Sequence, residues 1–257
     1  MATYKEEAVV LRAYDLGEAD RIISIITAGR GLRRAVAKGV KRTKSKFGAR
    51  LEPFSHITAI LYEGRNLDTV TQVEILHTHA AIRENYHKFL YGEAILEMVE
   101  KSLQENQVIP RLFDSLCTSL DALDGEVSKP ALLLAAFELK VCALIGYHPH
   151  LDECIHCGKS VGRERASLDL LGGGIVCVRC SRGLSRSVDL SPETLDLMRR
   201  LLEAQMAAIC TWDENPRLCR EVLGTAFRFS ESFLERPLKS GRVILQQLEE
   251  PPGGAGF

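Results

Sequence analysis

Four cysteines in two closely spaced pairs place the strongest restriction on how this chain folds. Cys154 and Cys157 form the first pair, and Cys177 and Cys180 form the second after nineteen intervening residues. Two thiolates three positions apart can face one ion, and two such pairs complete a tetrahedral shell of sulfur ligands. The spacing therefore predicts an inserted four-cysteine zinc ribbon at about residues 151–183, with one Zn²⁺ ion per chain.

Four cysteinates would leave no open position for water, so we expect the zinc to be structural and not catalytic. Gly158 follows the first pair, where a residue of positive φ is often required. The run Gly172–Gly174 suits a hairpin turn between the pairs. Two disulfides, unliganded cysteines, or a ligand set that includes His148, His150 or His156 remain alternatives.

A strongly basic segment covers residues 30–50. It contains nine cationic residues and no acidic one: Arg30, Arg33, Arg34, Lys38, Lys41, Arg42, Lys44, Lys46 and Arg50. The whole chain has a formal net charge of −1, so the residues outside the segment carry −10. A positive segment on an otherwise acidic protein predicts a local nucleic-acid-binding surface.

The basic segment contains a single aromatic residue, Phe47. Base stacking on this ring is a candidate role, because aromatic side chains in basic grooves often stack on nucleic-acid bases. A solvated charged loop, or a surface for an acidic partner protein, is the alternative interpretation of the segment.

Residues 1–79 are expected to form a β domain that binds DNA. Runs of β-branched or alternating residues, separated by turn residues, occupy positions 8–13, 22–27, 32–37, 57–62 and 67–75. Five short strands suit an OB-fold barrel. The loop between the third and fourth strands, at about 39–50, would carry most of the positive charge.

Residues 80–257 are expected to form an α-helical domain that contains the ribbon, which makes the chain an α+β multidomain protein. Apolar residues recur at helical spacing from Ile82 to Leu103, as the buried face of one helix requires. Further helices are expected to begin near Pro110, Pro130, Pro192 and Pro216. The tail at 249–257 has no apolar periodicity and is expected to be loose.

The composition favours a globular protein, with 46% hydrophobic and 26% charged residues. The sequence has neither an apolar run of the ~18 residues that a membrane helix needs nor a signal-peptide layout at its start. We therefore expect no membrane partner and a cytoplasmic, nucleoid-associated protein. The common catalytic motifs are missing from the sequence, so no enzyme activity is expected. Asp15, Glu18 and Asp20 leave a metal-dependent nuclease as an alternative.

Several stretches of the chain resemble the bacterial recombination protein RecO family. That family's opening strands and basic loop are similar to the runs E-A-V-V-L-R-A-Y-D-L-G-E-A-D-R-I and G-L-R-R-A-V-A-K-G-V-K-R-T-K-S-K-F-G-A-R-L-E-P-F. The helical region with its four-cysteine ribbon and the closing run P-L-K-S-G-R-V-I-L-Q-Q-L are also similar to the family. The resemblance spans nearly the whole chain.

The resemblance implies an N-terminal OB-fold followed by a helical domain with a zinc ribbon. It also implies a recombination mediator in the RecF-type pathway of DNA repair, which binds single- and double-stranded DNA and anneals complementary strands. The implied partners are RecR and SSB, with which the family assists the loading of RecA onto gapped DNA. A zinc-ribbon protein-interaction module is the alternative that the residues themselves leave open.

Overall fold

The computed structural model describes residues 2–43, 45–234 and 236–249. The chain packs as two compact units. The barrel unit comprises residues 1–92 with 99–125, and the helical unit comprises residues 93–98 with 126–257. The expected loose tail lies outside the described residues from position 250 onward. Among the described residues, no helix is both long enough and apolar enough to cross a membrane.

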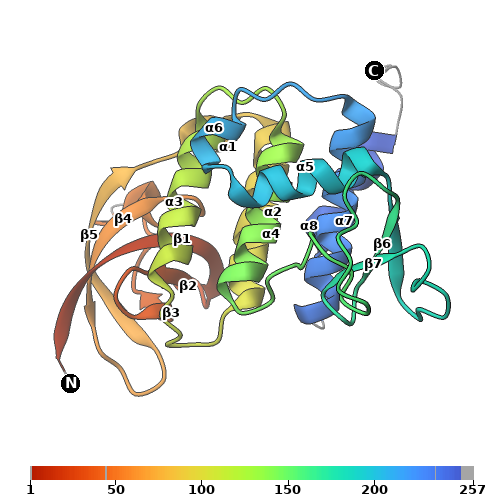
Figure 1. Ribbon diagram of the computed structural model, residues 1–257. Coiled ribbons are helices and arrows are strands. Elements are labelled where there is room, and N and C mark those ends of the chain that lie inside the picture. The colour runs from red at the N-terminus through yellow and green to blue at the C-terminus, as the bar shows by residue number, and fades with distance from the viewer. Residues whose placement is uncertain (1, 44, 235, 250–257) are drawn as a thin grey trace. The chain divides into compact units, whose positions relative to one another are not determined.

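Five strands open the barrel unit: β1 (Thr3–Leu16), β2 (Asp20–Thr27), β3 (Gly31–Ala37), β4 (His56–Tyr62) and β5 (Asp68–His77). They close into a barrel in the order β1-β2-β3-β5-β4 (Figure 1). Every neighbouring pair is antiparallel except β3 and β5. The prediction of five strands followed by helices is confirmed, and the observed strands mostly extend beyond the expected runs.

Alternating apolar residues of the strands fill the interior of the barrel, because successive side chains of a strand point to opposite faces. Ala8 and Val10 on β1 and Ile23 and Ile25 on β2 are among these buried residues. The connection between β3 and β4 contains a short 3-10 helix, η1 (Gly48–Leu51).

Three helices follow the barrel strands: α1 (Ala80–Glu84), α2 (Tyr86–Ser102) and α3 (Pro110–Asp124). The expectation of one helix from Ile82 to Leu103 is wrong, because Asn85 separates α1 from α2. Asn85 has extended backbone angles, and its side-chain oxygen accepts a hydrogen bond of 3.1 Å from the backbone N–H of Lys88. Asparagine favours this helix-capping position over a helix interior.

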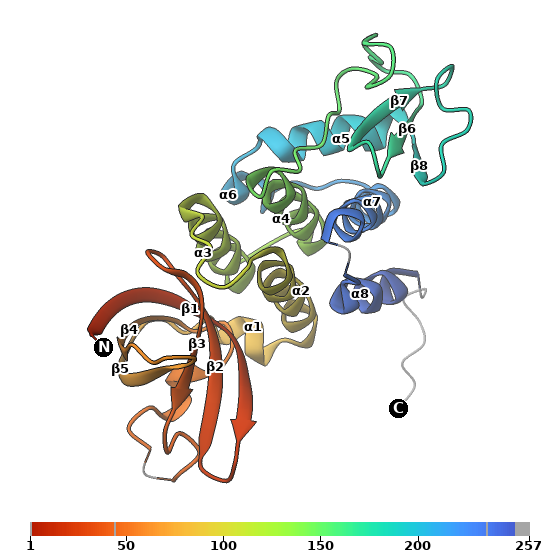
Figure 2. The ribbon, with the colours of Figure 1, turned by 90° about the horizontal axis from the view of Figure 1, so that it is seen from below.

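The helical unit contains the remaining elements: α4 (Pro130–Leu144), β6 (Ala166–Asp169), β7 (Gly174–Cys177), β8 (Ser187–Leu190), α5 (Pro192–Glu203), α6 (Met206–Ile209), α7 (Pro216–Leu234) and α8 (Lys239–Glu249). Helix α4 is buried on nearly all sides and packs against α5, α6 and α7 (Figure 2). The three strands form a small sheet in the order β7-β6-β8. The four helix starts predicted at prolines are confirmed.

The N-terminus of helix α8 is held by Glu97, a residue of α2. The backbone N–H groups of Lys239 and Ser240 donate to the buried carboxylate of Glu97 at 3.1 and 2.8 Å. Two residues into the helix, a Cβ on Gly241 would lie 2.4 Å from a ring carbon of Phe227, so only glycine allows this close packing. A carboxylate at a helix N-terminus also interacts favourably with the helix dipole.

Candidate functional site

The four cysteines predicted as metal ligands come together in the helical unit. Their sulfur atoms all lie within 4.8 Å of one another, and Sγ of Cys157 is 3.9 Å from Sγ of Cys177. Ligands at about 2.3 Å from a tetrahedral zinc ion are separated by about 3.8 Å. The cluster therefore fits a zinc ion. All four thiols are free, so the two-disulfide alternative finds no support.

The protonation of these cysteines also suits a cation. Burial raises the pKa of Cys154, but backbone hydrogen bonds from Cys177, His156 and Cys157 outweigh it, and the pKa falls to about 6. Side-chain hydrogen bonds with Cys177 and Cys157 raise the pKa of Cys180 to about 12. The negative charge of the thiolates already present in the cluster disfavours the formation of a further thiolate. A divalent cation bound to the cluster would offset this repulsion between thiolates.

Tight turns place the sulfurs. Gly158 has a φ of +68°, in agreement with the positive φ predicted there. Its N–H donates to the carbonyl of Cys154 at 2.8 Å. The turn between β6 and β7 contains Gly173, whose φ is +74°, so the predicted hairpin is present. Among the described residues, this group of candidate metal ligands consists of cysteines only. The histidine alternatives, His148, His150 and His156, lie outside it.

The basic segment lies on the barrel unit, and one of its arginines is committed to the fold. Nη2 of Arg33 lies 2.8 Å from Oδ2 of Asp68, a carboxylate in a residue that is only 2% exposed. The hydroxyl of Tyr4 donates to the same carboxylate. Burial, followed by the interaction with Asp68, raises the pKa of Tyr4 to about 12. Arg33 therefore neutralises a buried charge and is poorly placed to bind an external ligand.

Other cations of the segment have weaker partners. Three of them form ion pairs with acidic side chains, namely Arg30 with Glu6 at 3.7 Å, Arg34 with Glu105 at 3.4 Å and Lys41 with Asp15 at 2.9 Å. Two donate to backbone oxygens, namely Lys46 to Thr71 and Arg50 to Lys46. Exposed pairs contribute at most about 1 kcal/mol, so a phosphate group can replace such partners.

The side chains of Lys38 and Arg42 are the most available cations of the segment. Both residues are exposed, and within the described ranges neither side chain has a hydrogen bond or an ion pair. Lys44, which was also predicted to contact nucleic acid, lies outside the described residues. The basic surface is thus graded, from an arginine bound to a buried acid to two cations that have no partner in the part of the chain that the structure describes.

The prediction of base stacking on Phe47 is wrong for this structure. Phe47 is 1% exposed and belongs to the core of the barrel. The helix η1 turns the chain so that Phe47 and Leu51, four positions apart, both enter that core. A base could reach the ring only if the ring left the barrel, which would expose a large apolar side chain to water.

The acidic group at the β1–β2 turn has structural partners. Asp15 pairs with Arg21 at 3.3 Å and with Lys41, and Asp20 accepts a hydrogen bond of 2.7 Å from the backbone N–H of Gly39. Asp15, Glu18 and Asp20 are not among the metal-binding groups found in the described residues. Their arrangement gives no support to the nuclease alternative.

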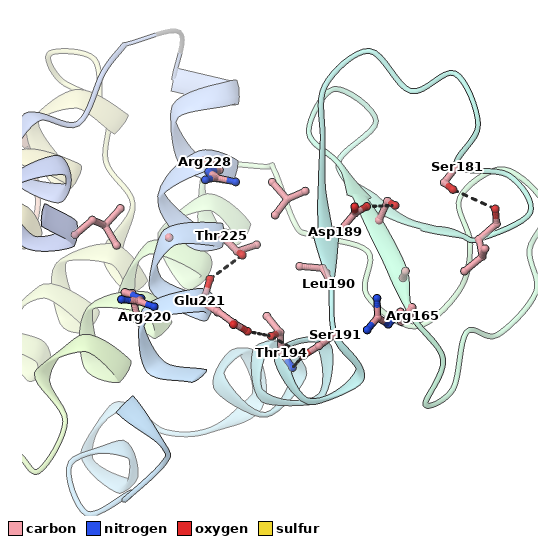
Figure 3. A pocket seen from close by; sticks show the side chains of 16 residues that line it. Arg165, Ser181, Asp189, Leu190, Ser191, Thr194, Arg220, Glu221, Thr225 and Arg228 are labelled. Atoms are coloured by element: carbon pink, nitrogen blue, oxygen red, sulfur yellow. Dashed lines mark hydrogen bonds between the residues drawn. The ribbon is translucent and has the colours of Figure 1, made fainter. Parts of the chain in front are cut away.

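A pocket of about 610 Å³ lies in the helical unit, between the β6–β8 sheet and α7 (Figure 3). Its charged lining comprises Arg165, Arg220, Arg228, Asp189 and Glu221. Glu221 accepts a hydrogen bond of 3.1 Å from Thr194, whereas Arg165 and Arg228 have no hydrogen bond or ion pair with any described residue. No sequence pattern indicated this pocket, because Arg165 lies more than 50 positions before the two arginines of α7.

The sequence matches two family profiles that together cover most of its length. The profile described as "Recombination protein O N terminal" matches residues 1–79, and "Recombination protein O C terminal" matches residues 83–242. The first match covers all five barrel strands. The second covers helices α2 to α7 and the cysteine cluster.

Similar full-length proteins carry the name "DNA repair protein RecO". The protein of Thermobifida fusca (strain YX) is 39% identical over 246 residues, which are 95% of this chain and 99% of the relative. The protein of Bifidobacterium longum (strain DJO10A) is 36% identical over 248 residues, with the same coverage. The protein of Frankia casuarinae is 39% identical over 242 residues, 93% of this chain and 97% of the relative.

The fold and the site define a protein in which a five-stranded barrel with a basic surface is joined to helices that hold a cysteine cluster. The chain belongs to the RecO family of DNA repair proteins.

Proposed function

We propose that the chain is a DNA-binding recombination mediator without enzyme activity. It binds single- and double-stranded DNA through the basic segment of the barrel, anneals complementary strands and, with RecR and SSB, assists the loading of RecA onto gapped DNA. Family membership supports this role. The observation that carries the DNA-binding step is the presence on the barrel surface of two exposed cations, Lys38 and Arg42, whose side chains have no partner among the described residues.

The domain division supports the same proposal. Residues 1–79 form an OB-fold whose strand order is β1-β2-β3-β5-β4, and OB-folds commonly bind nucleic acids on the barrel surface. Residues 80–257 form the helical domain with a ribbon at about 151–183. The four cysteines, Cys154, Cys157, Cys177 and Cys180, hold one structural zinc ion. We place the protein in the cytoplasm, associated with the nucleoid.

Phosphate contacts explain how such a surface anneals DNA. Each phosphate that a lysine or arginine neutralises releases counterions, so binding is strong at low salt and largely independent of sequence. A protein that neutralises two strands lowers their mutual repulsion and raises their local concentration. Annealing therefore needs no nucleotide hydrolysis by this chain. A requirement for ATP hydrolysis by the purified chain would contradict the proposal.

The alternative function is a zinc-ribbon module that binds proteins and not DNA. The pocket favours it as the second candidate, because Arg165 and Arg228, which have no hydrogen bond or ion pair with any described residue, suit an acidic partner segment. In that case the basic segment would contribute nothing to DNA affinity. Cleavage of labelled DNA in the presence of Mg²⁺ would instead indicate the nuclease alternative.

A set of charge substitutions separates these possibilities. In the loop variant, Lys41, Arg42, Lys44 and Lys46 are replaced by alanine. If all four side chains contact phosphates of one strand, the slope of log affinity against log salt falls by about 0.7 for each lost contact. In the pocket variant, alanine replaces Arg165 and Arg228, two arginines of the helical unit that have no partner among the described residues.

We expect the loop variant to lose DNA affinity equally on pyrimidine-rich and mixed sequences, and the pocket variant to keep it. Parent-like affinity and salt slope in a loop variant that still folds and holds zinc would refute the basic segment as the DNA site. Lost affinity in the pocket variant alone would move that site to the helical unit.

A further inference from the structure

Two histidines and an aspartate meet in the barrel unit, away from the cysteine cluster. His77 ends β5, His79 follows two residues later, and Asp121 lies on α3. Their ligand atoms all lie within 4.8 Å of one another. Nε2 of His79 is 2.9 Å from Oδ1 of Asp121, and Nδ1 of His77 is 3.9 Å from the same oxygen.

The ring of His79 is held in one orientation. His79 is fully buried, and its Nδ1 lies 2.7 Å from the carbonyl oxygen of Phe54. Because a carbonyl oxygen only accepts hydrogen bonds, Nδ1 carries a proton and donates it to Phe54. The other ring nitrogen, Nε2, is therefore the one directed at Asp121. Histidine ligands of metal ions are commonly oriented in this way, with the second ring N–H bonded to a backbone carbonyl.

This orientation creates a requirement for positive charge. A neutral imidazole with its proton on Nδ1 presents the lone pair of Nε2 to the carboxylate of Asp121. Two lone pairs at 2.9 Å repel each other, so the arrangement needs a cation between them. That cation is either a proton on Nε2 or a metal ion shared by the two side chains.

The position of His77 favours the metal ion. One proton would satisfy His79 and Asp121 without a third group, yet the ring of His77 lies only 4.4 Å, centroid to centroid, from that of His79. A second imidazole beside a buried imidazolium adds no stabilising charge, whereas it supplies a further nitrogen ligand to a metal. Ligand atoms around a tetrahedral ion at about 2.0–2.1 Å are separated by about 3.3 Å, between the two observed distances.

We propose that His77, His79 and Asp121 form a second metal site, which binds a divalent transition-metal ion of the zinc class. Two imidazole nitrogens and one carboxylate oxygen are ligands that such ions accept. The side chains of His77 and Asp121 are 50% and 56% exposed, so the remaining coordination positions face water. The bound ion links the end of β5 to α3.

The test is calorimetric titration of the full-length protein with ZnCl₂, after the ribbon has been loaded and excess metal removed. The parent is expected to bind one further equivalent of Zn²⁺. His77→Ala and Asp121→Asn each change an exposed ligand and are expected to lower that affinity by at least about tenfold. His87→Ala removes an exposed histidine of α2 outside the cluster and is expected to bind like the parent.

Zinc analysis before the titration, with one equivalent expected in every variant, shows that the ribbon and the fold are intact. The proposal is overturned if the parent takes up no further zinc, since the cation between His79 and Asp121 is then a proton. It is equally overturned if His77→Ala and Asp121→Asn bind like the parent, or if His87→Ala loses the additional ion as well. Because two exposed ligands are changed separately, a folding defect in one variant leaves the other to decide.

Discussion

The sulfur atoms of Cys157 and Cys177 lie 3.9 Å apart although 20 positions separate the residues in the chain. The β6–β7 hairpin returns the second cysteine pair to the first, and its turn depends on Gly173. The segment that carries both pairs is short and contributes two strands of four residues each, β6 and β7. A metal ion is therefore expected to supply much of the stability that a small core cannot.

The first prediction concerns zinc. The purified chain is expected to contain one equivalent in the cysteine cluster, and Cys177→Ser is expected to lose it. Elemental analysis measures the loss, and limited proteolysis is expected to show new cleavage within residues 151–183, because three thiolates hold zinc less well than four. Cys117→Ser changes a cysteine of α3 outside the cluster and serves as the control. Equal zinc content in both variants would exclude Cys177 as a ligand.

The second prediction concerns pH and a buried carboxyl group of α4. Burial raises the pKa of Glu138 to about 8 from an ordinary value of 4.5. Between these values the folded protein binds more protons than the unfolded chain, so the free energy of unfolding falls as pH rises. Glu138→Gln is therefore expected to be more stable than the parent at pH 9, by roughly 5 kcal/mol, and to lose that advantage below about pH 4.5.

Denaturant unfolding of the parent and the variant across this pH range measures the difference. Glu203→Gln, which changes an exposed carboxylate at the end of α5, is expected to follow the parent at every pH. A stability difference for Glu138→Gln that stays constant with pH would mean that Glu138 does not titrate in this window.

Local patterns predicted much of this fold. The spacing of the cysteines led to their cluster, and the prolines at positions 110, 130, 192 and 216 marked helix starts, because the fixed φ of proline suits the first turn of a helix. Alternating apolar residues located the five strands. The proline and strand signals lie within a few neighbouring residues, and the cysteine signal lies within one short segment, where the chain's own geometry determines the structure.

Features that depend on distant residues were missed. The charge of Arg33 was assigned to DNA, because nothing near it in sequence indicates its pairing with Asp68, 35 positions away. From the sequence, Phe47 is an aromatic residue in a loop. Only the closed barrel shows that its ring packs in the core. His77 and His79 are adjacent to a strand end, but their common partner Asp121 comes from α3.

The third prediction follows from the burial of Phe47. Phe47→Ala is expected to destabilise the barrel unit by about 3–5 kcal/mol, the usual cost of removing a buried phenylalanine ring. Phe47→Leu keeps most of the apolar volume and is expected to cost clearly less. Denaturant unfolding gives both values. Under conditions where both variants remain folded, their DNA affinity is expected to equal the parent's. A loss of affinity without a loss of stability would restore the stacking role.

The last prediction separates the cations of the basic segment by their partners. Arg42 has no partner among the described residues, so Arg42→Ala is expected to leave stability unchanged and to lower the salt slope of single-stranded DNA binding by about 0.7. Arg33 compensates the buried carboxylate of Asp68 at 2.8 Å, and its removal leaves that charge unpaired. Arg33→Ala is therefore expected to cost roughly 3 kcal/mol of stability and little of the salt slope.

Lys38→Ala is the companion to Arg42→Ala, because Lys38 is the other exposed cation of the segment that has no partner within the described ranges. Denaturant unfolding and DNA binding at several salt concentrations, measured on all three variants, separate a structural charge from a DNA-binding one. If Arg33→Ala lowers the salt slope as much as Arg42→Ala and unfolds like the parent, Arg33 exchanges Asp68 for phosphate on binding. All cations of the graded surface would then contribute to DNA binding, because the ion pairs of the free protein would not prevent any of them from contacting DNA.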